Sequence, residues 1–139
     1  MSRPTILRGA RLFDGEGFRD GLALALEGGR IAGLAAADGR GEALEGGILA
    51  PGLIDLQVNG GGGIMLDGSA TVERIAAICA AHARLGATGI LPTLITDTPE
   101  ATRAVIEAAV AAAAAGVPGF LGLHLEGPHL DPAQKGAHD

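Results

Sequence analysis

Segments with strand-like and helix-like patterns alternate from residue 51 onward, and this alternation restricts the fold more than any other feature. In chain order, these segments cover residues 53–58, 70–85, 88–95, 99–116 and 120–125. The units recur every ~30–40 residues, which is the size of a βα unit in a parallel sheet. The strand-like runs are almost entirely apolar, as is typical of strands covered on both faces. The sequence therefore predicts an α/β fold for residues 51–139.

Capping residues mark where the two helices should begin and end. Ser69 is expected to cap the first helix, with Glu73 near the positive end of its dipole, and Gly86 to end it. Thr98 precedes Pro99, which is a cap followed by a first-turn proline, at the start of the second helix. These signals support the division into strands and helices.

Residues 1–50 have a different pattern, with short apolar runs separated by glycine-rich turns. The runs cover residues 6–13, 21–26 and 30–34. Glycine pairs follow Glu27 and Glu45, and glycine also follows Asp38. These are turn signals, because glycine accepts a positive φ. The segment is predicted to be a small β-module, with the boundary to the second domain at residue 50.

The second domain is short for a closed barrel. A complete (β/α)8 barrel needs about 250 residues, whereas residues 51–139 can supply only three strands and two helices. Two alternatives follow from the pattern. The domain is either a smaller open α/β sheet, or the first part of a barrel whose remainder is absent.

Composition excludes several classes of function. A net charge of -6 and an aromatic content of 2% argue against a nucleic-acid partner. The single cysteine, Cys79, excludes an internal disulfide and is expected to be a buried, small apolar side chain. No signal peptide is recognisable, and no window approaches the ~20 apolar residues of a membrane span. The chain is therefore expected to be cytoplasmic, with no membrane contact.

Polar side chains gather where the three predicted strands end, which is the edge where parallel α/β folds build their sites. By strand, they are Asp55, Gln57 and Asn59, then Thr93, Thr96 and Asp97, then His124, Glu126, His129 and His138. Glu126 is the strongest candidate, because a carboxylate at a strand end can join histidines in a zinc-type site. Its alternative role is to cap the next turn or to pair with Lys135.

The other candidates also have alternative roles. His138 could hydrogen-bond a substrate, or lie on the surface. His124 could be a ligand, could orient one, or could be a hydrogen-bonded core histidine. The amides of Gln57 and Asn59 are weak zinc ligands, so they should supply hydrogen bonds to a site or satisfy the backbone. The glycine run 60–63 could cradle a phosphate or act as a flexible connector.

Together these residues resemble the N-acetylglucosamine-6-phosphate deacetylases of the amidohydrolase superfamily. The resemblance is carried by Pro51-Gly-Leu-Ile-Asp-Leu-Gln-Val-Asn-Gly60, by Gly86-Ala-Thr-Gly-Ile-Leu-Pro-Thr93, and by His124-Leu-Glu-Gly-Pro128 with Lys135-Gly-Ala-His138. These stretches look like the family's first three barrel strands and its substrate loop. The resemblance implies the first three strands of a metal-dependent (β/α)8 barrel, preceded by a small β-sandwich module, with domains 1–50 and 51–139.

The resemblance also implies a reaction and its residues. A metal-activated water would attack the acetamide of N-acetylglucosamine 6-phosphate, giving glucosamine 6-phosphate and acetate in amino-sugar catabolism. Glu126 would bind one divalent ion, zinc or iron. Ala137 and His138, with Gln57 and Asn59, would contact the substrate. Many superfamily members carry a His-x-His pair at positions 57 and 59, where this chain has Gln57 and Asn59. This departure from the pattern implies a site with one metal ion.

The remaining family residues have no counterpart in this sequence. The resemblance places two metal-binding histidines and the catalytic aspartate beyond residue 139, so no catalytic residue is expected within the chain. The isolated chain is therefore expected to be inactive, and the full-length protein to be a homodimer. Another amidohydrolase, such as a dihydroorotase or dipeptidase, is the alternative among enzymes. It would be expected to carry histidines at positions 57 and 59, where this chain has Gln57 and Asn59. The remaining alternative is a non-catalytic α/β module that self-associates or needs a complementary fragment.

Overall fold

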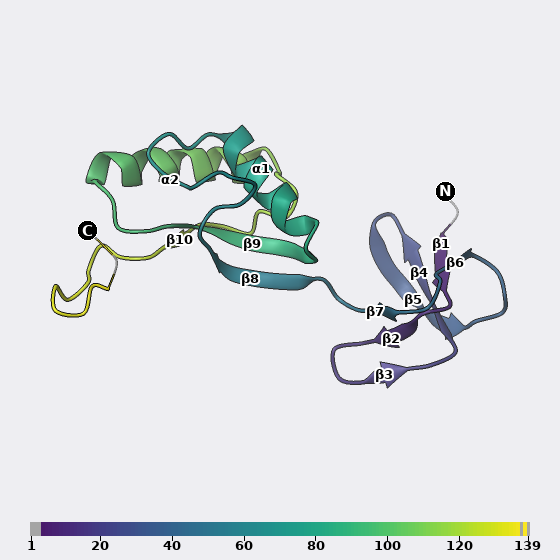
Figure 1. Ribbon diagram of the computed structural model, residues 1–139. Coiled ribbons are helices and arrows are strands. Elements are labelled where there is room, and N and C mark those ends of the chain that lie inside the picture. The colour runs from purple at the N-terminus through teal and green to yellow at the C-terminus, as the bar shows by residue number, and fades with distance from the viewer. Residues whose placement is uncertain (1–3, 137, 139) are drawn as a thin grey trace. The chain divides into compact units, whose positions relative to one another are not determined.

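The computed structural model describes residues 4–136 and residue 138, and the chain divides into two compact units (Figure 1). The first unit is Met1–Pro51 and the second is Gly52–Asp139. The first contains strands only, and the second contains strands and both helices. The chain is thus a mixed α/β protein with small sheets.

The first unit consists of two small sheets. One has the order β5-β4-β1-β6 and the other β3-β2-β7. The strands are β1 (Thr5–Arg8), β2 (Arg11–Phe13), β3 (Phe18–Arg19), β4 (Leu22–Glu27), β5 (Arg30–Ala36), β6 (Glu42–Ala43) and β7 (Ile48–Leu49). The predicted turn after Glu27 is confirmed, because Gly28 and Gly29 have φ values of 56° and 76° and join β4 to β5 as a hairpin.

The predicted single run over residues 6–13 is wrong, because the structure divides it between the two sheets. The break is at Gly9, where φ is 92° and a Cβ would lie 2.6 Å from the carbonyl oxygen of Leu44. Only glycine accepts both the positive φ and the close backbone approach. The apolar residues of this run therefore correctly indicated β-strand. The bend that divides the run between the two sheets, however, depends on the single residue Gly9.

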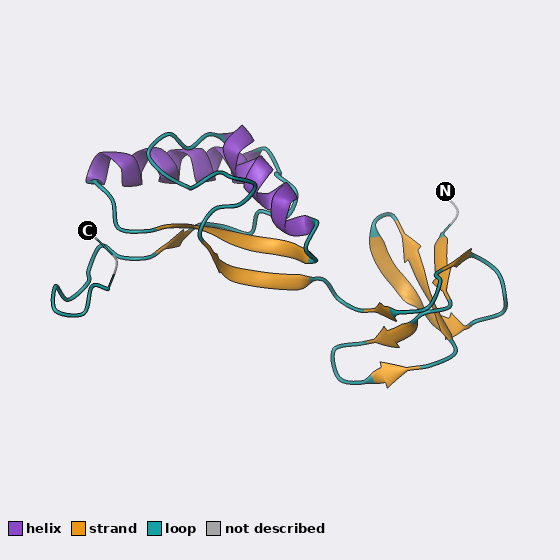
Figure 2. Cartoon of the chain, in the orientation of Figure 1, coloured by secondary structure: helices purple, strands orange, loops and turns teal. Residues whose placement is uncertain are grey.

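The second unit places both helices over one side of a parallel sheet (Figure 2). The strand order is β10-β9-β8, so β9 is central. The elements in chain order are β8 (Leu53–Val58), α1 (Val72–Ala83), β9 (Ala87–Leu94), α2 (Pro99–Ala114) and β10 (His124–Leu125). The predicted alternation of strands and helices is confirmed. The third strand is shorter than predicted, because Phe120 makes only an isolated bridge to Ile90.

The core of the second unit lies between its helices and the central strand. Its buried members are Val58, Leu66, Ile75, Ile78, Cys79, Ile90, Leu94, Val105 and Ala112. Cys79 is buried as predicted, and burial raises the pKa of its thiol. This thiol therefore serves as a small core side chain.

One of the two predicted caps is correct. Thr98 caps α2, and its side chain accepts a hydrogen bond from the Ala101 N–H at 3.1 Å. Ser69 does not cap α1, because its hydroxyl bonds to the Asp67 carboxylate. Thr71 takes that place and accepts from the Arg74 N–H at 3.2 Å. Serine and threonine are both good caps, so composition alone could not choose between them.

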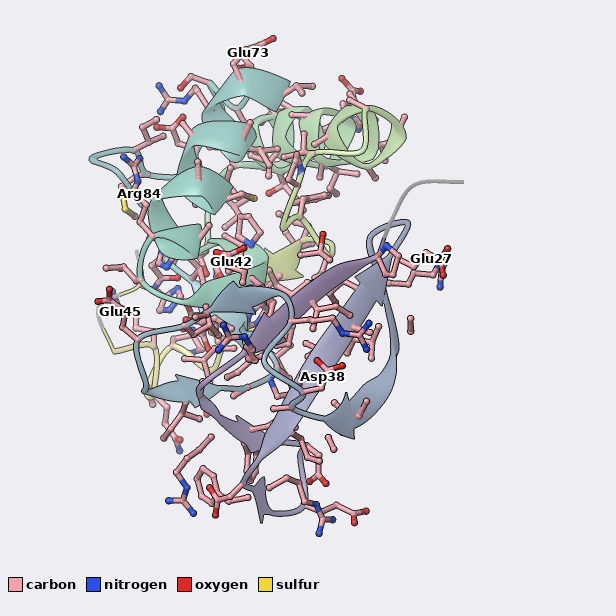
Figure 3. The ribbon with its side chains drawn as sticks, turned by 90° about the vertical axis from the view of Figure 1, so that its right-hand side faces the viewer. Glu27, Asp38, Glu42, Glu45, Glu73 and Arg84 are labelled. Atoms are coloured by element: carbon pink, nitrogen blue, oxygen red, sulfur yellow. The ribbon has the colours of Figure 1, made fainter. Side chains whose placement is uncertain are left out.

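The charges at the ends of α1 match the helix dipole. Glu73 lies in the first turn and Arg84 at the C-cap, at opposite ends of the helix (Figure 3). The Glu73 backbone N–H and the Thr71 hydroxyl lower the pKa of the Glu73 carboxyl. A negative group at the first turn and a positive group at the last each stabilise a helix.

Strand β8 is exposed, which contradicts the prediction that both faces of every strand are covered. Leu53, Ile54 and Leu56 have exposed fractions of 67%, 55% and 63%. Among the described residues, β8 pairs only with β9, so its other edge is open. The apolar pattern of β8 therefore describes a strand that its own unit does not cover. No helix in the described ranges is long and apolar enough to cross a membrane.

Candidate functional site

Glu126 directly follows β10 and lines a cavity of about 580 Å³. Its backbone N–H donates to the Leu94 carbonyl at 2.9 Å, which continues the pairing of β10 with β9. The cavity is lined by Asn59, Ile95, Glu126, Leu130, Gln134, Lys135, Gly136 and His138. The strand end therefore delivers one carboxylate to a hollow that residues from three strand ends and the last loop enclose.

His138 lies beside Glu126 in this cavity. Its Nε2 is 3.4 Å from Glu126 Oε1, and the side chains of His138 and Glu126 are 16% and 30% exposed. The other ring nitrogen, Nδ1, is 3.0 Å from Thr96 Oγ1. His138 is therefore not a surface histidine, and the alternative that placed it there is wrong.

Lys135 does not neutralise Glu126, although the sequence allowed that pairing. Its ammonium donates instead to the backbone carbonyl of His138 at 2.6 Å. The Glu126 carboxylate thus faces an imidazole and the cavity. This arrangement leaves the carboxylate oxygens accessible to a bound group.

The two amides predicted to contact substrate lie in different places. Asn59 lines the same cavity as Glu126 and His138, although its side chain is exposed. Gln57 is exposed on β8, and the described lining of the cavity does not include it. Its N–H donates to Asp55 Oδ1 at 3.1 Å. Ala137 falls outside the described residues.

Curated relatives and solved structures agree on what this chain is similar to. No family model matches it. Over 95 residues it is 45% identical to an N-acetylgalactosamine-6-phosphate deacetylase of Shewanella sp. (strain ANA-3), a match that covers 68% of this chain and 24% of the relative. Over 96 residues it is 42% identical to the human N-acetylglucosamine-6-phosphate deacetylase, covering 66% of this chain and 23% of the relative.

The structural matches span almost the whole chain. A crystal structure of N-acetylglucosamine-6-phosphate deacetylase from Pasteurella multocida matches with a TM-score of 0.87 at 26% identity, covering 99% of this chain and 38% of that one. A mutant of the Mycobacterium smegmatis enzyme, in complex with N-acetyl-D-glucosamine-6-phosphate, matches with a TM-score of 0.86 at 26% identity, covering 99% and 36%. The chain belongs to the N-acetylglucosamine-6-phosphate deacetylase family. It spans about a quarter of the length of the curated relatives it matches.

His124, which this member of the deacetylase family carries two residues before Glu126, has a backbone partner. Its Nδ1 is 3.1 Å from the Leu56 carbonyl oxygen of β8. The ring therefore ties the ends of two strands together, in agreement with the hydrogen-bonded alternative.

His82 and Thr93 hydrogen-bond to the backbone around the end of β8, and neither was assigned a role from the sequence. His82 of α1 places Nε2 2.9 Å from the Gly60 carbonyl, so it holds the glycine run that follows Asn59. Thr93 is buried, and its Oγ1 accepts from the Val58 N–H at 2.9 Å. Spacing on a helix could not reveal the partner of His82. The position of Thr93 at the end of the second strand was the available signal for its role.

The glycine run is held in place by its own backbone. Gly61 and Ile64 donate to each other's carbonyl groups at 2.8 and 3.0 Å, and Gly60 donates to Val58 at 2.9 Å. The N–H groups of Gly60 and Gly61 are thus used within the loop.

The metal chemistry of the family can be compared with the donors present. The described part of the chain holds no group of three or more His, Cys, Asp or Glu side chains placed to bind one ion. The Glu126 carboxylate, facing the cavity with an imidazole beside it, fits a single ligand position. A catalytic zinc site uses three protein ligands, so the described residues do not by themselves complete such a site.

Proposed function

We propose that this chain forms part of a metal-dependent deacetylase that hydrolyses the acetamide of N-acetylglucosamine 6-phosphate to glucosamine 6-phosphate and acetate. The observation that carries the proposal is the meeting of Glu126 and His138, 3.4 Å apart, in a cavity that Asn59 also lines. The names of its relatives support the substrate class. The proposal includes a cytoplasmic location and a homodimeric full-length protein.

Glu126 is the proposed ligand for one divalent ion, zinc or iron. When bound, such an ion supplies Lewis-acid activation of a water for attack on an amide carbonyl. The carboxylate is partly exposed at a strand end and faces no competing ammonium group, so it can bind an ion. The remaining ligands, two histidines, and the catalytic aspartate are expected from the rest of a complete (β/α)8 barrel.

The sugar is proposed to bind on the Asn59 and His138 side of Glu126. His138 and Asn59 line the cavity and offer hydrogen-bonding groups to sugar hydroxyls or to the acetamide. Ala137 and Gln57 are proposed as further contacts to the substrate. The Gln57 and Asn59 amides are proposed to occupy the positions where other superfamily members bind a second metal ion. Lys135 also lines the cavity and places a positive charge near an anionic substrate.

N-acetylgalactosamine 6-phosphate is a second candidate substrate. The relative with 45% identity is named for that sugar, whereas the human relative with 42% identity is named for the glucosamine epimer. The two substrates differ only in the configuration at one ring carbon. The acetamide chemistry is the same for both, so a comparison of kcat/KM values decides between them.

Acetate release tests the proposed function. The purified chain alone should release no acetate from either sugar phosphate, because its described donors supply too few ligands for a catalytic ion. A fusion of this chain to the remaining segment of the Shewanella relative should release acetate in the presence of zinc or iron. In this fusion, Glu126→Gln should lower kcat/KM by at least about a hundredfold, since loss of even outer-shell groups costs 10–100-fold.

Glu107→Gln is the matched control for that substitution. Glu107 is an exposed carboxylate on α2, and its replacement should leave acetate release unchanged. The deacetylase proposal is wrong if the folded fusion releases no acetate, or if Glu126→Gln and Glu107→Gln have equal effects. Turnover by the isolated chain would contradict the expected need for further ligands.

The exposed strand β8 favours one alternative, a non-catalytic module that associates with itself. Its open edge and its exposed Leu53, Ile54 and Leu56 side chains offer a surface for pairing. Size-exclusion chromatography should show the isolated chain as oligomers, and Leu56→Lys should shift it toward a monomer. A cooperatively melting wild-type monomer would contradict this expectation and favour an independent module.

A further inference from the structure

Lys135 bonds to both polar groups of the His138 backbone, although the proposed mechanism uses only its charge. The carbonyl oxygen of Lys135 accepts from the His138 N–H at 3.1 Å, and its ammonium donates to the His138 carbonyl oxygen at 2.6 Å. A hydrogen bond with a charged donor is shorter and stronger than one between neutral groups. One residue therefore holds the main chain of His138 at its donor and at its acceptor.

The backbone bond closes a turn whose second residue is glycine. A bond from the N–H of His138 to the carbonyl group three residues earlier is the hydrogen bond of a β-turn. Gly136 occupies the second position of this turn with φ of 58°, which glycine adopts without steric cost. The lysine side chain adds a second bond across the same four residues.

The last loop meets the segment after β9 through the His138 ring. In the described part of the loop, from Pro128 to Gly136, the hydrogen bonds join residues two or three positions apart. The ring of His138, in contrast, places Nδ1 3.0 Å from Thr96 Oγ1. The position of the ring in the cavity therefore depends on the turn that carries it.

We propose that Lys135 is a positioning residue, whose ammonium holds the backbone of His138 and so keeps the imidazole in the cavity beside Glu126. The inference rests on the proposed function, because there His138 is a contact to the substrate. Both bonds of Lys135 are made to the main chain of His138. The proposal is therefore independent of which ring nitrogen carries a proton.

A positioning role and a direct contact to the substrate's phosphate make different demands on Lys135. A phosphate contact acts only when the sugar phosphate is bound, and its loss leaves His138 unchanged in the free chain. The positioning role acts in the free chain, where the ammonium already donates to the His138 carbonyl group. Removal of the ammonium should therefore change His138 with no ligand present.

NMR of the purified, isotopically labelled chain without ligand tests the proposal. Lys135→Met keeps a long side chain and removes its donor. This substitution should move the carbonyl carbon signal of His138, and it should accelerate amide hydrogen exchange at His138 by about tenfold, the effect of losing one hydrogen bond. Lys135→Arg should restore the wild-type carbonyl signal and exchange rate, because a guanidinium can donate to the same oxygen.

Arg103→Met is the matched control, because it also removes one positive charge. Arg103 is exposed on α2 and is not among the residues that line the cavity. Its replacement should leave the His138 signals unchanged. Unchanged His138 signals in folded Lys135→Met would overturn the proposal, as would equal changes in the two methionine variants. A wild-type His138 amide that exchanges as fast as in an unstructured peptide would also overturn it, even if Lys135→Met does not fold.

The fusion to the Shewanella segment adds a kinetic measurement. Lys135→Met should raise KM for the sugar phosphate by about tenfold and leave kcat nearly unchanged, because His138 is proposed to bind the sugar and not to react. An unchanged KM in an active fusion would contradict the positioning role. The NMR measurements need no turnover, so failure of the deacetylase assay is separate from failure here.

Discussion

Replacing Gly60 with alanine is expected to lower the free energy of unfolding of the second unit by at least about 2 kcal/mol. Gly60 has φ of 78°, a conformation that costs other residues about 1–2 kcal/mol. A Cβ would also lie 2.2 Å from the Ile64 carbonyl oxygen, which is backbone and cannot rotate away. The loop must therefore open. Urea denaturation followed by helical circular dichroism measures the loss, because both helices lie in the second unit.

Gly63→Ala is the matched control within the same loop. Gly63 has φ of 81°, but a Cβ there would meet no atom within 4 Å. This substitution should cost only the conformational strain, about 1–2 kcal/mol. If the two alanine variants lose equal stability, the close approach of Gly60 to Ile64 does not contribute. Chemical shifts of Asn59 should move in Gly60→Ala more than in Gly63→Ala, because residue 60 sets the backbone that follows Asn59.

The fold of the second unit was largely predictable because its signals are local. Apolar runs, the Thr98-Pro99 start of α2 and the glycine after α1 are each read within a few residues. The errors occurred where two local choices were equivalent or where a partner was distant. Ser69 and Thr71 are both competent caps, and the hydrogen bond of Ser69 to Asp67 decided between them. The exposure of β8 depends on which segments cover it.

The candidate site was predictable in part, for a related reason. Glu126 could be singled out because a carboxylate after an apolar run and before Gly-Pro is a local pattern. Its neighbour His138 belongs to a loop whose path no periodicity describes. The partner of His124 is Leu56, which is remote in sequence, and the bond of His82 to Gly60 crosses from a helix to a loop. These contacts exist only once the sheet is assembled.

Ile75→Ala is expected to destabilise the second unit by about 2–5 kcal/mol, the range observed for Ile-to-Ala changes in cores. Ile75 is 0% exposed on α1 and belongs to the single buried cluster that joins both helices to β9. The lost methyl groups leave a cavity that rigid neighbours such as Ile90 and Val105 cannot fill. The measurement is again the denaturation midpoint of the helical signal at constant m-value.

Ile106→Ala is the matched control, because it separates the effect of burial on stability from the effect of helix propensity. Ile106 lies on α2 with 41% of its surface exposed, so the same chemical change should cost less than about 1 kcal/mol. Equal losses of unfolding free energy at the two positions would show that the cluster is not the main source of stability.

The site depends on the same cluster, because β9 leads directly to Thr96 and pairs with β10 before Glu126. Ile75→Ala should therefore also broaden the His138 ring signals, whereas Ile106→Ala should leave them unchanged.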